Sequence, residues 1–153
     1  MNISKPAKIA IVVIGLGIVY RLYNLYNLSN IVSYSVAGVS FGRSGLKFSV
    51  TVKWNILNPT STNVKLKSIV GKLFINNNWV SDFKGPELDV KPGLVSYNTT
   101  FNIDNLGAVT ALISAISAKK YPVFNVEMAT DLGLFAVKNK FNIDTAEYAN
   151  QLV

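Results

Sequence analysis

The sequence contains no cysteine and no histidine, and only eight of its 153 residues are aspartate or glutamate. Without cysteine the chain cannot form a disulfide, use a thiol nucleophile or carry a cysteine-linked lipid. Without histidine it also lacks the imidazole base and the usual zinc ligand sets. The absence of these two residue types therefore excludes catalysis by a thiol or an imidazole and zinc sites built from cysteine or histidine.

The few acidic residues form no recognisable catalytic or metal-binding set. Glu87 and Asp89 flank Leu88 in a predicted loop, but two carboxylates without further oxygen ligands make a weak cation site. Gly42-Arg43-Ser44-Gly45 lacks the residues of a phosphate-binding loop or a nucleophile elbow, and it predicts a hairpin turn. We therefore predict no catalytic residue, no metal site and no cofactor, in a protein that is not an enzyme.

Length and composition favour one folded domain with an appended segment. A chain of 153 residues is long enough for one domain with a core, and 50% hydrophobic residues are too many for a disordered chain. Lysine and arginine outnumber acidic residues by 15 to 8, which gives a net charge of +7. This charge favours anionic partners, although a mildly basic soluble domain is the simpler interpretation.

An apolar run from Ile9 to Tyr20 follows Lys5 and Lys8 and precedes Arg21. Bulky residues follow the run, so a signal peptidase site is missing. The run alone spans about 18 Å as a helix, short of the roughly 30 Å hydrocarbon core of a bilayer. A helix extended from Pro6 to Leu28 reaches about 34 Å. We therefore predict a signal anchor, a transmembrane helix within residues 1–29, ahead of a domain over residues 30–153.

The two lysines before the apolar run predict the orientation of this anchor. They favour a cytoplasmic N-terminus and a domain on the non-cytoplasmic side of the membrane. An alternative stays open, because Leu22, Leu25 and Leu28 form a stripe that equally suits packing against other protein subunits. The residues predicted to contact lipid are Ile9, Ile11, Val12, Val13, Ile14, Leu16, Ile18, Val19, Tyr20 and Tyr23.

From Ile31 onward the apolar period changes to two. The alternation is strongest from Leu46 to Ile56, which predicts a strand with one buried face, and Asn58-Pro59 ends it. The apolar phase then shifts by one residue, which predicts a β-bulge near Ser68. Further along, the pattern predicts a turn at Asn76-Asn77-Asn78, a return strand over residues 79–83 and a loop over residues 84–93.

The second half of the domain combines a strand, a helix and a hairpin. A strand that carries Tyr97 and Ile103 is followed by helical spacing over residues 105–119, with Asp104 as the predicted N-cap. The last hairpin spans residues 124–143 and turns near residues 131–133. Phe-Asn-Ile-Asp occurs at residues 101–104 and again at 141–144, and Asp144 with Glu147 fits a capping pattern. Similar local physics explains the two copies better than duplication.

Several motifs together resemble those of a known family: the alternating strand that runs into Asn58-Pro59, Val64-Lys65-Leu66, Leu73-Phe74-Ile75-Asn76-Asn77, Trp79-Val80 and Tyr121-Pro122-Val123. This order is similar to the water-stress-and-hypersensitive-response (WHy) domain of the atypical late embryogenesis abundant proteins. The similarity covers roughly residues 36–144. It implies a mostly-β fold, a seven- or eight-stranded antiparallel β-sandwich of immunoglobulin or fibronectin type, with one helix before the last hairpin. It also implies a non-catalytic role in stabilising or contacting membranes or other macromolecules. Only Asn58 and Pro59 carry over, as structural turn residues.

Six lysines are candidate contacts for an anionic partner: Lys65, Lys67, Lys119, Lys120, Lys138 and Lys140. Four lie on the outward faces of predicted strands and two follow the helix, so neighbouring hairpins could join them into one basic patch. Solvated strand faces that discourage aggregation are the simpler interpretation. Aromatic residues do not alternate with these lysines, and Tyr97 and Trp79 are interpreted as core or rim residues. A nucleic acid partner is therefore disfavoured.

The leading functional expectation is a membrane-anchored β-sandwich with a structural, stabilising or binding role and no small-molecule substrate. Membrane lipid is the expected partner of the N-terminal helix, with other protein subunits as a further option. The alternative is a structural component of a larger assembly, such as a phage virion or an envelope complex. Small size, 17 asparagines and the absence of cysteine and histidine motivate that alternative. An AT-rich genome produces a similar composition.

Overall fold

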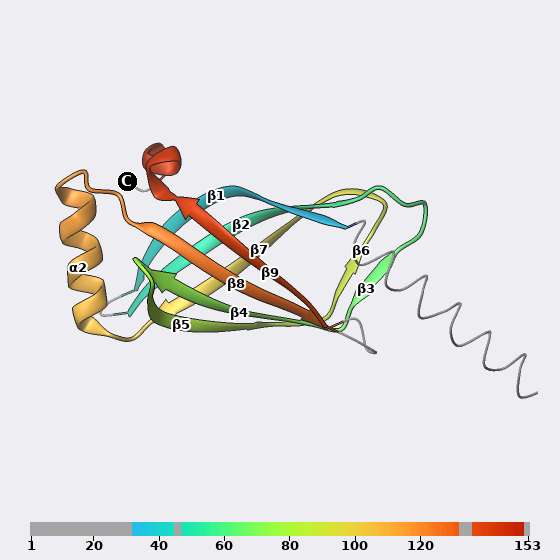
Figure 1. The fold of residues 1–153 in the computed structure, drawn as a ribbon, viewed down its shortest axis with the longest axis horizontal. Helices are drawn as coiled ribbons and strands as arrows, with labels where there is room; N and C mark the ends of the chain where they lie inside the picture. The colour runs from blue at the N-terminus through green and yellow to red at the C-terminus, as the bar shows by residue number, and fades with distance from the viewer. Residues whose placement is uncertain (1–31, 45–46, 132–135, 152–153) are drawn as a thin grey trace, which may run out of the picture.

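Alternating apolar and polar residues build nine β-strands in the part of the chain that this computed structural model describes, residues 32–44, 47–131 and 136–151. Each strand runs antiparallel to its neighbours, in three sheets ordered β1-β2-β7, β3-β6 and β5-β4-β8-β9 (Figure 1). The predicted mostly-β, antiparallel architecture is confirmed, with more strands than the seven or eight expected. The bounds are β1 Ser33–Ser44, β2 Lys47–Asn58, β3 Val64–Leu66, β4 Ser68–Ile75, β5 Asn78–Gly85, β6 Leu88–Val90, β7 Gly93–Ile103, β8 Val123–Asp131 and β9 Ala136–Asp144.

The three-stranded sheet is built around β2, which pairs with β1 and β7 along its whole length. Four of its predicted inward residues, Val50, Val52, Trp54 and Ile56, are buried and at most 1% exposed. Phe48 is half-buried, and Leu46 lies outside the described residues. A hairpin joins β1 to β2 as predicted, and Gly45 of the predicted turn lies outside the described residues. Gly42, Arg43 and Ser44 are not turn residues, and this part of the prediction was wrong. They are the last residues of β1 instead, because their backbone pairs with β2 from Ser49 to Lys47.

The four-stranded sheet faces the three-stranded sheet across one hydrophobic core. Aromatic rings bridge the two sheets. The ring centroids of Trp54 and Phe141 are 4.8 Å apart, and those of Phe41 and Phe124 are 5.9 Å apart in an edge-to-face arrangement. Such ring pairs add specific contacts to the area that each side chain buries. The inward faces of the two sheets therefore hold each other in place.

The chain changes sheets at Lys67, where the sequence predicted a β-bulge near Ser68. Leu66 ends β3, which pairs with β6, whereas Ser68 begins β4 and pairs with Asp131 of β8. The backbone N–H of Lys67 donates to the carbonyl oxygen of Asp131 at 2.8 Å. The prediction was wrong because the apolar phase shifts when the strand leaves one sheet for another. A register shift does occur in β4, but between Leu73 and Phe74.

The region after β4 contains more strand than expected. Asn76 and Asn77 form the predicted tight turn with positive φ angles of 49° and 65°, which asparagine tolerates well. The return strand β5 extends to Gly85, and β6 occupies residues 88–90, where a loop was predicted. Residues 88–90 form a strand and not a loop because their backbone pairs with β3.

Helix α2, Leu106–Ser117, lies at one end of the domain (Figure 1). It is the only α-helix among the described residues and confirms the predicted helix between the strand and the last hairpin. Its N-cap is Asn105 rather than the predicted Asp104. The Asn105 Oδ1 atom accepts from the N–H groups of Gly107 at 2.9 Å and Ala108 at 3.1 Å. The cap therefore lies one residue later than the sequence repeat suggested.

The second copy of the Phe-Asn-Ile-Asp repeat does place its aspartate at a cap. The N–H of Ala146 donates to Asp144 Oδ1 at 3.0 Å at the start of η1, Thr145–Gln151, a 3-10 helix. The hydroxyl of Thr145, which is fully buried, donates to the carbonyl oxygen of Pro122 at 2.7 Å. Because two different residue positions cap the two helical segments, the copies have different local structures.

The predicted anchor, with its lipid-contacting residues between Ile9 and Tyr23, lies outside the described residues. No helix among the described residues is both long and apolar enough to cross a membrane. The described chain begins at Val32, which is only 6% exposed. From there β1 starts at the end of the domain that carries β3 and β6, and α2 lies at the opposite end (Figure 1).

Candidate functional site

The outer face of the four-stranded sheet gathers charged side chains from four strands. Strand pleating turns every second residue to this face. In one row across the sheet, Lys72 of β4 lies between Asp82 of β5 and Glu127 of β8, and Glu127 pairs with Lys140 of β9. Lys72 and Asp82 belong to one hairpin, and Glu127 and Lys140 belong to another. Pairing of β4 with β8 brings the two hairpins together, because Lys72 and Glu127 are 127 − 72 = 55 positions apart.

A parallel row, two residues along each strand, has an apolar centre. Val70 lies between Lys84 and Ala129, and Ala129 pairs with Lys138. The two rows line a shallow hollow of about 530 Å³. Val70, which is 40% exposed, and Ala129 form its floor. We call this hollow the basic trough and define it by Val70, Lys72, Lys84, Ala129, Lys138 and Lys140.

The charges of the basic trough are unequal. Four lysines and the two acids Asp82 and Glu127 line it, so its formal charge is 4 − 2 = +2. Lys140 Nζ lies 2.6 Å from Glu127 Oε1. Lys72, Lys84 and Lys138 form no ion pair with any residue that the structure describes. Three lysine ammonium groups are therefore available to an anionic ligand.

The two acids of the trough already have partners. The hydrogen bond from Lys140 lowers the pKa of Glu127, with smaller contributions from the charges of Lys140, Lys72 and Lys138. Asp82 Oδ1 accepts a hydrogen bond of 2.9 Å from the indole N–H of Trp79. Both carboxylates thus accept a hydrogen bond from a neighbouring side chain.

Two aromatic residues extend this face beyond the lysines. Phe74 pairs with Trp79 on one side and with Asn125 on the other. Phe74 and Lys140 both line a second hollow of about 310 Å³. Trp79 is 59% exposed. The sequence predicted that aromatic residues do not alternate with the six lysines. Phe74 and Trp79 lie on the face of Lys138 and Lys140, in the next row across the sheet and not between the two lysines.

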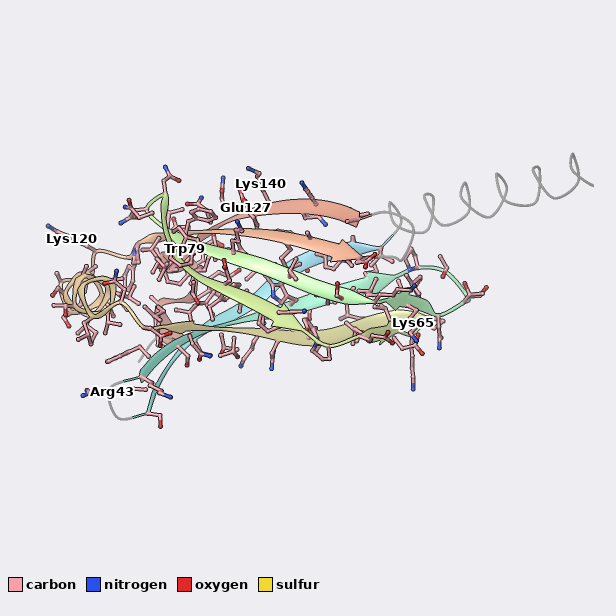
Figure 2. The ribbon with its side chains drawn as sticks, turned by 90° about the horizontal axis from the view of Figure 1, so that it is seen from below. Arg43, Lys65, Trp79, Lys120, Glu127 and Lys140 are labelled. Atoms are coloured by element: carbon pink, nitrogen blue, oxygen red, sulfur yellow. The ribbon has the colours of Figure 1, made fainter. Side chains whose placement is uncertain are left out.

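The six lysines predicted from the sequence do not form one patch. Lys138 and Lys140 line the basic trough. Lys65 pairs with Glu87 at 2.8 Å, near the β3 end of the domain, and Lys67 follows β3 directly. Lys119 and Lys120 follow α2. Figure 2 shows Lys65 and Lys120 at opposite ends, with Glu127 and Lys140 on the side between them.

Lys72 and Lys84 line the trough but were not among the six predicted lysines. The outward positions of both residues could be found from the alternation within β4 and β5. Their proximity to Lys138 could not, because it depends on the strand order β5-β4-β8-β9. The two predicted turn residues occupy a different place: Asn58 is fully buried at the end of β2, and Pro59 follows it on the surface.

The remaining acids do not form a metal site in the described part of the chain, which has no group of three or more acidic side chains that could hold a metal ion. Glu87 is paired with Lys65, an interaction that lowers the pKa of Glu87. Asp89 accepts a hydrogen bond of 3.3 Å from the side-chain amide of Asn63. The chemistry that this arrangement offers is binding of negative charge over an apolar floor.

No family model matches the sequence, and no curated protein matches it either. Among solved structures, a protein of Arabidopsis thaliana aligns over 72% of this chain and 80% of its own, with a TM-score of 0.51 and 13% identity. A protein of Archaeoglobus fulgidus aligns over 73% and 90%, with a TM-score of 0.49 and 12% identity. A β-glucuronidase of glycoside hydrolase family 2 aligns over 73% of this chain but 11% of its own, with a TM-score of 0.44 and 14% identity. At these identities the likeness to the plant protein concerns the fold alone.

Proposed function

We propose that this chain is a non-enzymatic, membrane-anchored β-sandwich module of the immunoglobulin or fibronectin type, similar to the WHy domain, that binds an acidic segment of another protein. The observation that carries the binding role is the basic trough, in which three lysines without an ion pair among the described residues surround the apolar floor of Val70 and Ala129. The N-terminal segment holds the module at the membrane, with the domain on its non-cytoplasmic side.

The dimensions of the trough suit an extended acidic peptide. Strands in a sheet lie about 4.8 Å apart, so Lys84 on β5 and Lys138 on β9 are separated by about 14 Å across the sheet. A peptide that crosses the strands would place carboxylates near both lysines and an apolar side chain over Val70. Opposite charges across such a contact raise the association rate and the specificity. The apolar floor favours a peptide over a free phosphate.

Binding of poly-L-glutamate to the full-length protein in detergent micelles tests the trough. Trp79 is the reporter, because it is 59% exposed beside the trough, whereas Trp54 is 1% exposed. The variant K72Q/K84Q/K138Q should bind at least about tenfold more weakly at low salt. The control K67Q/K119Q/K120Q removes the same charge elsewhere and should stay within about twofold. Equal losses in both variants, or equally tight binding of a single-stranded oligonucleotide, would argue against a peptide site.

Flotation tests the anchor separately. The full-length protein should float with phosphatidylcholine vesicles and stay with them through a carbonate wash, because a helix from Pro6 to Leu28 is long enough to span. Replacing Val13 and Leu16 with aspartate should abolish flotation, since each charge at the centre of a span costs about 2.5–3.5 kcal/mol. Protein that stays in the soluble fraction would contradict the anchored module.

A second candidate is a structural subunit of a larger assembly, and the surface of α2 favours it. Helix α2 has no charged residue, and Leu106 and Ile113 on its surface are 65% and 43% exposed. Exposed apolar side chains on one helix are typical of protein contacts. If this candidate is right, full-length protein should form oligomers in detergent that L106S/I113S dissociates. A monomer at all concentrations would rule it out.

A further inference from the structure

Two leucines lie side by side on the outward face of the three-stranded sheet. Leu57 pairs with Ser33 on one side and with Leu94 on the other. Leu57 is 42% exposed and Leu94 is 65% exposed. Their chain neighbours Ile56 and Val95 face the core instead, so the two leucines contribute little to it. We call Leu57 and Leu94 the leucine pair.

The rest of this face is polar and nearly uncharged. From Ser49 to Asn55 on β2 and from Ser96 to Asn102 on β7, only Lys53 carries a charge. The outward residues in these stretches are Ser49, Thr51, Lys53, Asn55, Ser96, Asn98, Thr100 and Asn102. Small polar side chains suit contact with water. The leucine pair is therefore a local apolar spot at one end of a hydrophilic face, and its position needs a separate reason.

The leucine pair lies where the chain joins the domain. Val32 is buried, and the next residue, Ser33, pairs with Leu57. Strand spacing places Leu57 about 5 Å and Leu94 about 10 Å from Ser33. Leu28 ends the apolar sequence that precedes the domain, and the four residue steps from Leu28 to Val32 span at most about 14 Å. The leucine pair is thus tethered close to whatever holds the N-terminal segment.

We propose that the leucine pair inserts into the headgroup region of the bilayer that holds the N-terminal segment, as a second membrane contact that fixes the orientation of the domain. Apolar side chains bind a bilayer by entering about 5–10 Å into the boundary between headgroups and acyl chains. The exposed Lys91, three residues before Leu94, would lie near lipid phosphates. This inference rests on the proposed membrane anchoring.

Single fluorescent labels on the full-length protein test the inference, because the sequence has no cysteine of its own. A nitrobenzoxadiazole label is attached at S96C, beside the leucine pair, or at N102C, on the same face and strand but at the other end. The protein is inserted into phosphatidylcholine vesicles that contain doxyl-labelled lipid. The label at residue 96 should be quenched by the doxyl lipid and reduced by dithionite at least about threefold more slowly than the label at residue 102.

The same labels in the L57S/L94S background show whether the leucine side chains cause the protection. Loss of the difference between positions 96 and 102 supports the inference. Equal accessibility of both positions in protein that floats with the vesicles overturns it and leaves the anchor intact. Protection from dithionite without lipid quenching also overturns it, because a second protein copy then covers the face. Protein that does not float overturns both the inference and the proposed anchoring.

Discussion

The side-chain amide of Asn58 donates a hydrogen bond of 2.9 Å to the carbonyl oxygen of Val90, which lies 32 positions further along the chain. The same amide donates to the carbonyl oxygen of Thr62 at 2.9 Å. Asn58 Oδ1 accepts from the N–H and the hydroxyl of Thr60 at 3.1 and 2.7 Å. The buried asparagine is therefore fully bonded, and it ties the end of β2 to β6.

Replacing Asn58 with alanine should lower the free energy of unfolding by about 2–4 kcal/mol, because it leaves buried carbonyl groups without a donor. Urea denaturation of the full-length protein in detergent, followed by tryptophan fluorescence, measures the change. The control N98A removes an exposed asparagine from β7 and should change stability by less than about 0.5 kcal/mol. Similar losses in both variants would mean that Asn58 is not the link between β2 and β6.

The buried indole of Trp54 provides a second test. Its N–H donates to Thr99 Oγ1 at 2.9 Å, and both residues are at most 1% exposed. The variant T99V keeps the shape but removes the acceptor, so the unfolding free energy should fall by about 1–3 kcal/mol. The adjacent Thr100 bonds to Thr51 at 2.9 Å on the exposed face, and T100V should cost less than about 0.5 kcal/mol. A larger loss of unfolding free energy in T100V than in T99V would contradict the conclusion that the buried Trp54–Thr99 hydrogen bond is the more important one.

The effects of mutations at Gly85 and Tyr97 on stability are predicted to depend on each other. The space where a side chain would begin at Gly85 is filled by the Tyr97 hydroxyl and the ring of Phe83. G85A should therefore destabilise the domain by about 1–3 kcal/mol through overpacking. The buried Tyr97 hydroxyl has no hydrogen-bond partner among the described residues, so Y97F should be neutral or stabilising. A double-mutant cycle should show that G85A costs less in the Y97F background, whereas additive effects would contradict the contact.

The exposed pair in the basic trough predicts a pH dependence. Lys140 holds the pKa of Glu127 below its ordinary value of 4.5 in the folded protein. Because the folded pKa is the lower one, the carboxylate stabilises the fold above pH 4.5 and loses this effect as the pH falls through its folded pKa. Carbon-detected NMR titration should place the midpoint of Glu127 below 4.5 and move it upward in K140Q. An unchanged midpoint in K140Q would show that the ion pair is not formed in solution.

Local patterns predicted much of the fold. The alternation in β2 identified most of its buried residues. The run of asparagines predicted the turn before β5, where Asn76 and Asn77 have positive φ angles. The change of sheet at Lys67 could not be predicted, because a bulge and a change of sheet both shift the apolar phase by one residue. The N-cap was misplaced because Asp104 and Asn105 are both good caps, and only the bonds to Gly107 and Ala108 decide between them.

The candidate site was much less predictable than the fold. Lys138 and Lys140 were identified as outward residues, but the trough also needs Lys72 and Lys84 from a distant hairpin. Their meeting depends on β4 pairing with β8, a contact between residues more than fifty positions apart. Hydrophobic periodicity gives the outward face of each strand and does not give the order of strands in a sheet.

Helix α2 lies at the opposite end of the domain from the leucine pair, and the length of β7 separates the two. Strand β7, Gly93–Ile103, runs from the leucine pair towards α2. Its eleven residues correspond to a strand length of about 34 Å. The surface potential of a charged leaflet decays within a Debye length of about 8 Å at physiological salt. If the leucine pair inserts into the bilayer as proposed, Leu106 and Ile113 lie beyond the electrostatic field of the lipid headgroups. A change in lipid charge would then leave a protein contact made by α2 unaffected.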